Sequence, residues 1–335
     1  MEATRGSAIT GWATALPETV VTNEDLARVL DTSDQWIRER TGIEQRRVAT
    51  GPFAPPPADP RTLISPPRGV GTTAALGVEA GRKAIESAGL DRRDIDLLIL
   101  CTTTADQTVP ATSSALSAEL GLNCGAFDLN AACSGFVYGM VAAAAFIRTA
   151  FDRILVIGSE TLSRITDWND RSTAVLFGDG AGAVVIEAVP GEGSLLGWDL
   201  GVDGRLQPIL YADLNGPMIM EGREVYRRAV RVVIESAETA MERAKVRSDE
   251  ITLFVPHQAN GRIIEGVCAR LGIPMEKSAI VLDRTGNTSS ASIPIALVEA
   301  LSAGRVSDGD LILLSGFGAG MTWASAVWRW GPLSR

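Results

Sequence analysis

The chain is poor in several residue types that mark particular functions. Its 335 residues include one histidine, His257, and three lysines, Lys83, Lys245 and Lys277. Acidic residues outnumber basic ones by 40 to 31, which gives a formal net charge of −9. A general nucleic-acid-binding protein needs a broad basic face, so this balance argues against that class, although a local basic patch is compatible with it.

Cysteine is also scarce and irregularly spaced. The four cysteines, Cys101, Cys124, Cys133 and Cys268, form no CxxC pair. Disulfide frameworks and zinc sites both depend on regular spacing, so we expect free thiols and no metal site.

No segment is typical of a signal peptide or a membrane span. The N-terminal MEATRGSAITGWA lacks a basic start followed by a continuous apolar core. The apolar run 131–147 is short for a span and rich in Ala and Gly, which favours a buried core helix. We therefore expect a cytoplasmic protein that does not bind membranes. The chain is long enough for one large domain or for two lobes, each with its own core.

The predicted elements follow the same order in both halves of the chain. Short apolar strands alternate with helical patterns, which favours an α/β fold with mostly parallel sheets. Four strands of the first half match four of the second: 96–100 with 251–255, 126–129 with 279–282, 154–160 with 311–317, and 177–188 with 317–330. The matched order predicts a duplicated α/β unit with halves 1–189 and 190–335.

Two glycine-rich segments, GDGAGA at 178–183 and GFGAG at 316–320, look at first like phosphate-binding loops. A phosphate loop follows a strand and opens a helix, so that amides and the helix dipole face the phosphate. Each segment here leads into a strand instead. We therefore predict no dinucleotide or P-loop site.

Cys133 and Asn287 occupy equivalent positions in the two predicted halves. Cys133 lies in DLNAACSGFVYG, among small residues at a helix start, where the helix dipole favours a thiolate. Asn287 lies in RTGNTSSASIP, and His257 ends the preceding strand. Thr102 and Cys133 are 31 residues apart, and His257 and Asn287 are 30 apart. Taken singly, each position is ordinary: Cys133 is typical of a buried thiol, His257 of a turn residue and Asn287 of a helix cap. Two facing lobes would bring them together as a nucleophile and two hydrogen-bonding groups for a carbonyl oxygen.

Several motifs together resemble those of a known family. They are TSDQWIRERTGIEQRR (32–47), AACSGF, RSTAVLFGDGAGA (171–183), PHQAN, GNTSSASIP and SGFGAGMTW (315–323). Over nearly its whole length the chain resembles β-ketoacyl-acyl-carrier-protein synthase III, of the thiolase superfamily. The resemblance implies an α/β thiolase-like duplicated five-layered αβαβα fold and a homodimer.

The resemblance also implies a two-stage condensation that starts fatty-acid synthesis or primes a polyketide. Cys133 takes the starter acyl group from acyl-CoA, and the backbone amides of Cys133 and Ala319 form the oxyanion hole. His257 and Asn287 then hold the thioester carbonyl of malonyl-acyl carrier protein, and loss of CO₂ gives an enolate that attacks the acyl-enzyme. Phe317 is expected near the malonyl carboxylate. Acyl-CoA is a substrate, and no permanently bound cofactor is implied.

CoA-binding positions follow from the same resemblance. Trp36 matches a residue that stacks on adenine, and Arg40 and Arg171 match residues near the adenine or the phosphates. From the residues alone, Thr32 to Gln35 are compatible with a capping box that starts the helix carrying WIRER. Without the other motifs, WIRER is typical of a solvated helix face with one buried aromatic residue.

Further positions bear on the protein partners. Arg227 and Arg262 match residues expected to contact the acidic carrier protein. Val109 matches a position, often larger in the family, that reaches into the partner subunit's acyl tunnel, and a small residue there suggests a branched or bulkier starter. Gly261 stands where the family prefers a larger apolar residue.

The chain departs from the family at 50–69, TGPFAPPPADPRTLISPPRG, where a short connection is usual. This segment holds seven of the sixteen prolines. We interpret it as a polar, partly extended surface insertion, with a loop at the substrate or carrier-protein entrance as the alternative. The segment 197–216, which helps to shape the acyl pocket, is shorter than usual, so the resemblance does not define the starter group.

Other functions compete with condensation. An acyltransferase of the same family transfers its acyl group to an oxygen or nitrogen nucleophile, or to a carrier protein, without chain extension; such relatives often alter the His/Asn pair. Thiolases need a second cysteine in a glycine loop, whereas Cys268 lies in a helical pattern. Hydroxymethylglutaryl-CoA synthases need an additional glutamate, for which we find no motif. An inactive partner subunit typically lacks the nucleophile that Cys133 provides.

Overall fold

Two mixed sheets form the framework of the computed structural model, which describes residues 5–53, 71–214 and 216–331. In spatial order, the strands of the first sheet are β1 (Arg5–Ala15), β7 (Asp179–Pro190), β6 (Arg153–Thr161), β4 (Leu97–Cys101) and β5 (Gly125–Leu129). Those of the second are β11 (Leu253–Pro256), β12 (Leu311–Gly318), β13 (Thr322–Arg329) and β8 (Leu195–Val202). Two short ladders pair β2 (Val20–Thr22) with β3 (Gln45–Arg47) and β9 (Leu210–Ala212) with β10 (Met218–Met220).

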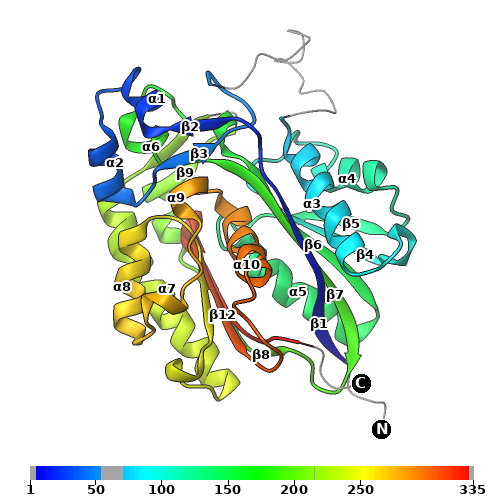
Figure 1. Cartoon of the computed structure of the whole chain (residues 1–335). Helices are drawn as coiled ribbons and strands as arrows, with labels where there is room; N and C mark the ends of the chain where they lie inside the picture. The colour runs from blue at the N-terminus through cyan, green and yellow to red at the C-terminus, as the bar shows by residue number, and fades with distance from the viewer. Residues whose placement is uncertain (1–4, 54–70, 215, 332–335) are drawn as a thin grey trace.

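Helices lie between the two sheets and on their outer faces (Figure 1). The central helices α5 (Gly135–Thr149) and α10 (Ser292–Ser302) share one apolar core with both sheets. The outer face of the first sheet is covered by α3 (Thr73–Ser87) and α4 (Thr112–Leu120). The outer face of the second is covered by α7 (Gly222–Ala244) and α8 (Gly261–Leu271). The predicted αβαβα layering is therefore confirmed.

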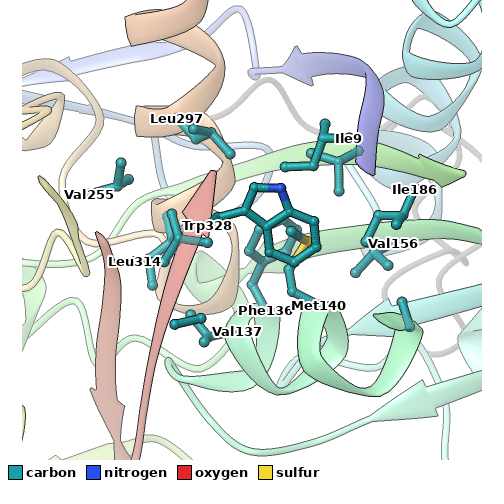
Figure 2. Packing of buried hydrophobic residues seen from close by; sticks show 14 of the residues in the cluster. Ile9, Phe136, Val137, Met140, Val156, Ile186, Val255, Leu297, Leu314 and Trp328 are labelled. Atoms are coloured by element: carbon teal, nitrogen blue, oxygen red, sulfur yellow. The ribbon is translucent and has the colours of Figure 1, made fainter. Parts of the chain in front are cut away.

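Trp328 of β13 lies in the middle of the shared core (Figure 2). The indole is 1% exposed and packs among side chains that come from both sheets and from α5. Successive side chains on a strand point to opposite faces. Trp328 therefore faces the central layer, whereas its neighbour Val327 belongs to the cluster beneath α7 and α8.

The apolar segment Ala132–Thr149, which contains α5, has the length and hydropathy of a candidate membrane span, but 61% of it is buried inside the molecule. Small residues allow this close packing. A Cβ atom added to Gly139 would lie 2.6 Å from Cys101 Sγ and 3.1 Å from Val156 Cγ1, so α5 rests directly on β4 and β6. This segment is a core helix, as its composition predicts.

Both sheets follow the same plan. The β4, β6, β7 and β1 series of the first sheet corresponds to β11, β12, β13 and β8 of the second. The prediction of mostly parallel sheets is wrong, because β7 runs antiparallel to both β6 and β1, and β13 does the same between β12 and β8. The three residues that connect β12 to β13 are too few for the crossover that parallel strands require.

The predicted strand at 279–282 is also wrong. A single bridge joins the preceding residue, Ser278, to β11, and α9 (Leu282–Thr285) begins where the strand was expected to end. The buried side chain of Gln258 pairs with the backbone instead, because its Oε1 accepts hydrogen bonds from the amides of Val281 and Leu282 at 3.0 and 3.1 Å. A side-chain amide thus satisfies backbone groups that a sheet would otherwise pair.

The N-terminal helices α1 (Asn23–Ala27) and α2 (Asp34–Thr41) belong to a small cluster with the β2–β3 ladder and α6 (Arg171–Ala174) (Figure 1). The predicted capping box from Thr32 to Gln35 does not form. Ser33 caps α2 by accepting the Trp36 amide at 3.1 Å, and the Gln35 side chain instead donates to Glu39 at 2.8 Å.

The base of the proline-rich segment rests on the chain that follows β6. Thr50 Oγ1 is 2.6 Å from Ser163 Oγ, and Phe53 packs edge-on against Trp168 with ring centres 5.4 Å apart. Both interpretations of this segment depend on residues 54–69, which lie outside the described residues.

Candidate active site

Cys133, His257 and Asn287 line one cavity of about 1310 Å³. Cys133 comes from the first half of the chain, and the other two come from the second. Phe317 and Ala319, at the end of β12, line the same cavity. The structure therefore brings together all five residues that the sequence placed at the reaction centre.

Cys133 lies in a tight turn immediately before α5. Ala132 adopts a φ of 49°, a left-handed conformation that is rare for residues other than glycine and that occurs often at functional sites. Ser134 Oγ donates to the Ala131 carbonyl at 2.6 Å and holds the turn. A Cβ atom on Gly318 would come within 2.5 Å of Cys133 N. Glycine at that position lets β12 of the second half lie directly against the nucleophile turn.

Cys133 is partly exposed to the cavity, but protein atoms surround its thiol. Burial raises the pKa of Cys133 to about 12; the polar Ser289 side chain opposes this rise, and the Glu160 carboxylate adds to it. The helix-dipole argument favours a thiolate, but desolvation outweighs it here. Cys133 is therefore a neutral thiol at neutral pH before substrate binds.

His257 follows β11, is 3% exposed, and packs edge-on against Phe317 with ring centres 5.4 Å apart. Its Nδ1 lies 2.6 Å from Ser292 Oγ, which also accepts the Gln258 amide at 3.3 Å. We assign the Ser292 hydrogen to Nδ1 and the ring hydrogen to Nε2, because Ser292 Oγ already accepts the Gln258 amide. Burial lowers the pKa of His257 to about 3, so the imidazole is neutral and its Nε2–H is a donor.

Asn287 is held by main-chain and side-chain hydrogen bonds. Its amide donates to the Leu176 carbonyl at 2.8 Å, and its carbonyl accepts the Gly178 amide at 3.0 Å. Its side-chain Oδ1 accepts the Ser289 amide at 2.8 Å. Because Oδ1 is occupied, Nδ2 is the atom that Asn287 can offer to a ligand as a donor.

The predicted CoA-binding residues gather around one indole. The guanidinium groups of Arg40 and Arg171 lie 4.5 and 5.0 Å from the ring centre of Trp36. Trp36 and the exposed Arg40 line the cavity. Arg171 is fixed by a 2.7 Å hydrogen bond to the Asp31 carbonyl.

The predicted partner-contacting residues are more widely spread. Arg262, at the start of α8, lines the cavity. Arg227 lies on α7 in a separate groove that it shares with Arg231 and Arg270, and it pairs with Glu224 at 2.8 Å. Val109 is 81% exposed and is not among the described residues that line its own chain's cavity.

Gly261 precedes Arg262 and lies against the end of α2. A Cβ atom there would lie 3.3 Å from the Thr41 carbonyl, so a larger residue requires α2 and α8 to separate slightly. This close approach accounts for glycine at the position where the family prefers a larger side chain.

Sequence reasoning missed much of the apolar wall. The missed wall residues include Leu162, Ile165, Leu210, Met218 and Met220. They come from the segment after β6 and from the β9–β10 hairpin, and no local motif marks them. The sequence also gave no signal for Ser292 as the partner of His257. Among the described residues, no group of three His, Cys, Asp or Glu side chains is arranged to hold a metal ion.

The junction of the two similar αβ halves brings together three side chains. They are a cysteine before a central helix, a neutral histidine, and an asparagine whose Oδ1 is occupied and whose Nδ2 can donate. This combination of fold and site defines a condensing enzyme with the thiolase fold.

Comparisons with known proteins identify the family more closely. The family model described as 3-oxoacyl-[acyl-carrier-protein (ACP)] synthase III matches residues 127–204, and its C-terminal counterpart matches 241–330. The chain is 46% identical over 329 residues to the β-ketoacyl-[acyl-carrier-protein] synthase III of Geobacillus kaustophilus, covering 97% of this chain and 99% of that protein.

Solved structures agree with the sequence relatives. The 3-oxoacyl-[acyl-carrier-protein] synthase III of Aquifex aeolicus matches with a TM-score of 0.89 and 41% identity, covering 97% of this chain and all of that one. The priming β-ketosynthase of the R1128 polyketide biosynthetic pathway matches with a TM-score of 0.88 and 33% identity, covering 100% and 99% of the two chains. The chain belongs to the β-ketoacyl-acyl-carrier-protein synthase III family, whose members are acyltransferases.

Proposed function

We propose that this enzyme loads an acyl group from acyl-CoA onto Cys133 and condenses it with malonyl-acyl carrier protein, with loss of CO₂. One observation carries this proposal. The cavity that holds Cys133 also holds two neutral donors, the imidazole of His257 and the Nδ2 group of Asn287. Two neutral donors suit a step in which negative charge develops on a carbonyl oxygen. The relatives named above, which include a priming ketosynthase, support the same reaction.

In the loading step, Cys133 Sγ attacks the thioester carbonyl of acyl-CoA. The new Sγ–C bond forms, the C–S bond to CoA breaks, and CoA leaves as a thiolate that takes up the proton released by Cys133. The amides of Cys133 and Ala319 stabilise the tetrahedral oxyanion. Trp36 stacks on the adenine, and Arg40 and Arg171 neutralise the phosphates.

In the condensation step, His257 Nε2 and Asn287 Nδ2 donate to the thioester oxygen of the malonyl group. The bond to the carboxylate breaks, CO₂ leaves, and its bonding electrons form an enolate. The enolate carbon attacks the acyl carbon on Cys133, the C–S bond breaks, and the released Cys133 thiolate takes up one proton from solvent. Phe317 provides an apolar wall where a carboxylate is poorly solvated, which favours departure as CO₂.

The protein partners follow the same logic. Arg262 beside the cavity, and Arg227 on the neighbouring helix, are placed to meet an acidic carrier protein. The exposed Val109 and the half-exposed edge strand β5 support a homodimer in which Val109 enters the partner's cavity. The bacterial relatives support a cytoplasmic enzyme. Sedimentation velocity should then show a species of twice the chain mass. A monomer at micromolar concentration would contradict the dimer.

Intact-protein mass spectrometry with a panel of acyl-CoAs tests the first half-reaction. A covalent acyl adduct should form on the wild-type enzyme and be absent from Cys133→Ala, and its mass identifies the starter. Absence of an adduct with every donor would overturn the loading step.

Malonyl-acyl carrier protein added to the loaded enzyme then tests condensation. The acyl group should leave with one equivalent of CO₂ and appear as a β-ketoacyl product. His257→Ala and Asn287→Ala should slow this step by about 100-fold or more while acylation continues. Release of the acyl group without CO₂ would instead support simple acyl transfer.

A further inference from the structure

The hydroxyl of Ser289 has no role in the steps above, although Ser289 lines the cavity with Cys133, His257 and Asn287. Ser289 is 2% exposed, and its Oγ has no hydrogen-bond partner of ordinary geometry among the described residues. Seven other buried side-chain atoms in the described part of the chain also lack a partner, but none of their residues lines this cavity. Burying an unpaired hydroxyl is unfavourable, and at this position the hydroxyl is free to donate to negative charge that develops in the cavity.

The backbone holds Ser289 in an unusual conformation. Its φ of 47° lies in the left-handed region that few residues other than glycine adopt. Its amide donates to Asn287 Oδ1 at 2.8 Å, and the next residue, Ser290, donates to Glu160 from its amide at 3.3 Å and from its hydroxyl at 2.7 Å. The turn is therefore fixed on both sides of Ser289, so the strained conformation persists.

This turn lies against the start of the helix that follows Cys133. A Cβ atom on Gly135 would lie 3.7 Å from the Cβ of Ser290, which is ordinary packing contact. Ser289 and Cys133 line the same cavity, and the Ser289 side chain opposes the rise in pKa that burial causes at Cys133. Among side chains, Ser289 is the one that lowers the pKa of that sulfur.

We propose that Ser289 is a further catalytic residue of the loading step, whose hydroxyl donates a hydrogen bond to Cys133 Sγ as the thiolate forms and attacks acyl-CoA. The proposal depends on the nucleophilic role of Cys133 proposed above. Ser289 keeps its own proton throughout, and the proton that leaves Cys133 ends on the departing CoA. A hydrogen bond to a charged sulfur is stronger than one to a thiol, so it favours the reactive form.

The test uses Ser289→Ala and Ser289→Gly, with Ser236→Ala as the matched control. Ser236 lies on α7 and also has a buried, unpaired hydroxyl, but it is not among the cavity residues. Glycine relieves the positive φ and alanine does not, so the pair separates loss of the hydroxyl from backbone strain. The first readout is the rate of Cys133 alkylation by iodoacetamide between pH 7 and 10, which requires no CoA binding.

We expect both Ser289 variants to react with iodoacetamide about tenfold more slowly than wild type at each pH. Single-turnover acylation should fall by about 10- to 100-fold, while Ser236→Ala stays at the wild-type rate. If iodoacetamide shows the effect and the wild-type enzyme accepts no acyl-CoA, the proposed function fails but the Ser289–Cys133 interaction stands.

Three results would overturn the proposal. Wild-type alkylation in both variants would show that Ser289 does not act on the sulfur. Wild-type alkylation in Ser289→Gly alone would assign the effect to backbone strain. Normal loading with slow condensation of the pre-acylated variants would place the hydroxyl on the enolate instead.

Discussion

His257 and Cys133 meet in this enzyme as neutral side chains, because the cavity walls desolvate both. Burial lowers the pKa of the imidazole to about 3 and raises that of the thiol to about 12. Desolvation disfavours the charged form of each group, so a resting thiolate–imidazolium pair is doubly unfavourable. A neutral imidazole suits condensation, because it can donate a hydrogen bond to the enolate. Cys133 must then be activated by substrate binding and by nearby hydrogen-bond donors.

The pH dependence of condensation tests this point at the residue scale. An unperturbed histidine loses its neutral form as the pH falls through about 6.5. With the pKa of His257 lowered to about 3, the neutral fraction stays close to one from pH 8 to pH 5. Single-turnover condensation of pre-acylated enzyme should therefore show no acid limb in this range. A limb with a midpoint near 6.5 would show that His257 titrates normally.

The central helices determine where the catalytic residues lie. The turn that carries Cys133 leads into α5, and the segment that carries Asn287 leads into α10. Both helices pack between the sheets through small residues. A Cβ atom on Gly182 of β7 would lie 2.7 Å from Pro294 Cβ and 2.9 Å from Ile295 N, both in α10.

We expect Gly182→Ala to move α10 away from β7. Overpacking of this kind lowers the free energy of unfolding by about 1–3 kcal/mol, and the shift should also slow condensation through Asn287. Gly204→Ala is the control, because no atom lies within 4 Å of the Cβ position there. Denaturant unfolding measures both variants. Equal stability of the two would contradict the close packing of α10 on β7.

Glu160 joins the two halves of the molecule directly beneath the site. The carboxylate is fully buried at the end of β6 and accepts the amides of Thr103 and Thr104, both at 3.1 Å, in the first half. From the second half it accepts the Ser290 hydroxyl at 2.7 Å. One charged group therefore aligns the turn after β4 with the turn that carries Asn287.

Glu160→Gln should change two quantities, the free energy of unfolding and the rate at which Cys133 is alkylated. Loss of an acceptor oxygen leaves buried donors unpaired, so unfolding should become easier by at least about 1–3 kcal/mol. Because the Glu160 carboxylate raises the pKa of Cys133, loss of its charge should speed alkylation of that thiol at a fixed pH, in contrast to the Ser289 variants.

Glu79→Gln is the control for this change, because Glu79 forms an exposed i,i+4 pair with Lys83. Pairs of that kind contribute about 0–1 kcal/mol. Urea unfolding and timed iodoacetamide labelling measure both effects. Slower labelling of Glu160→Gln than of wild type would contradict the electrostatic role.

The sequence by itself determined the duplicated plan and the principal catalytic candidates, and its resemblance to the family implied the layers. Apolar periodicity, the small-residue turns around Cys133 and Asn287, and matched spacing all act locally, so they can be read along the chain. The same local patterns predicted a strand at 279–282 that does not form. The backbone amides there donate to the side chain of Gln258 instead of to a neighbouring strand.

Only the tertiary structure decided how those residues behave. Segments distant in sequence exclude water together and so decide the neutral state of His257, the orientation of the Asn287 amide and the placing of Ser289 in the cavity of Cys133. Desolvation and hydrogen-bond geometry depend on every neighbour in space, and no local pattern encodes those neighbours.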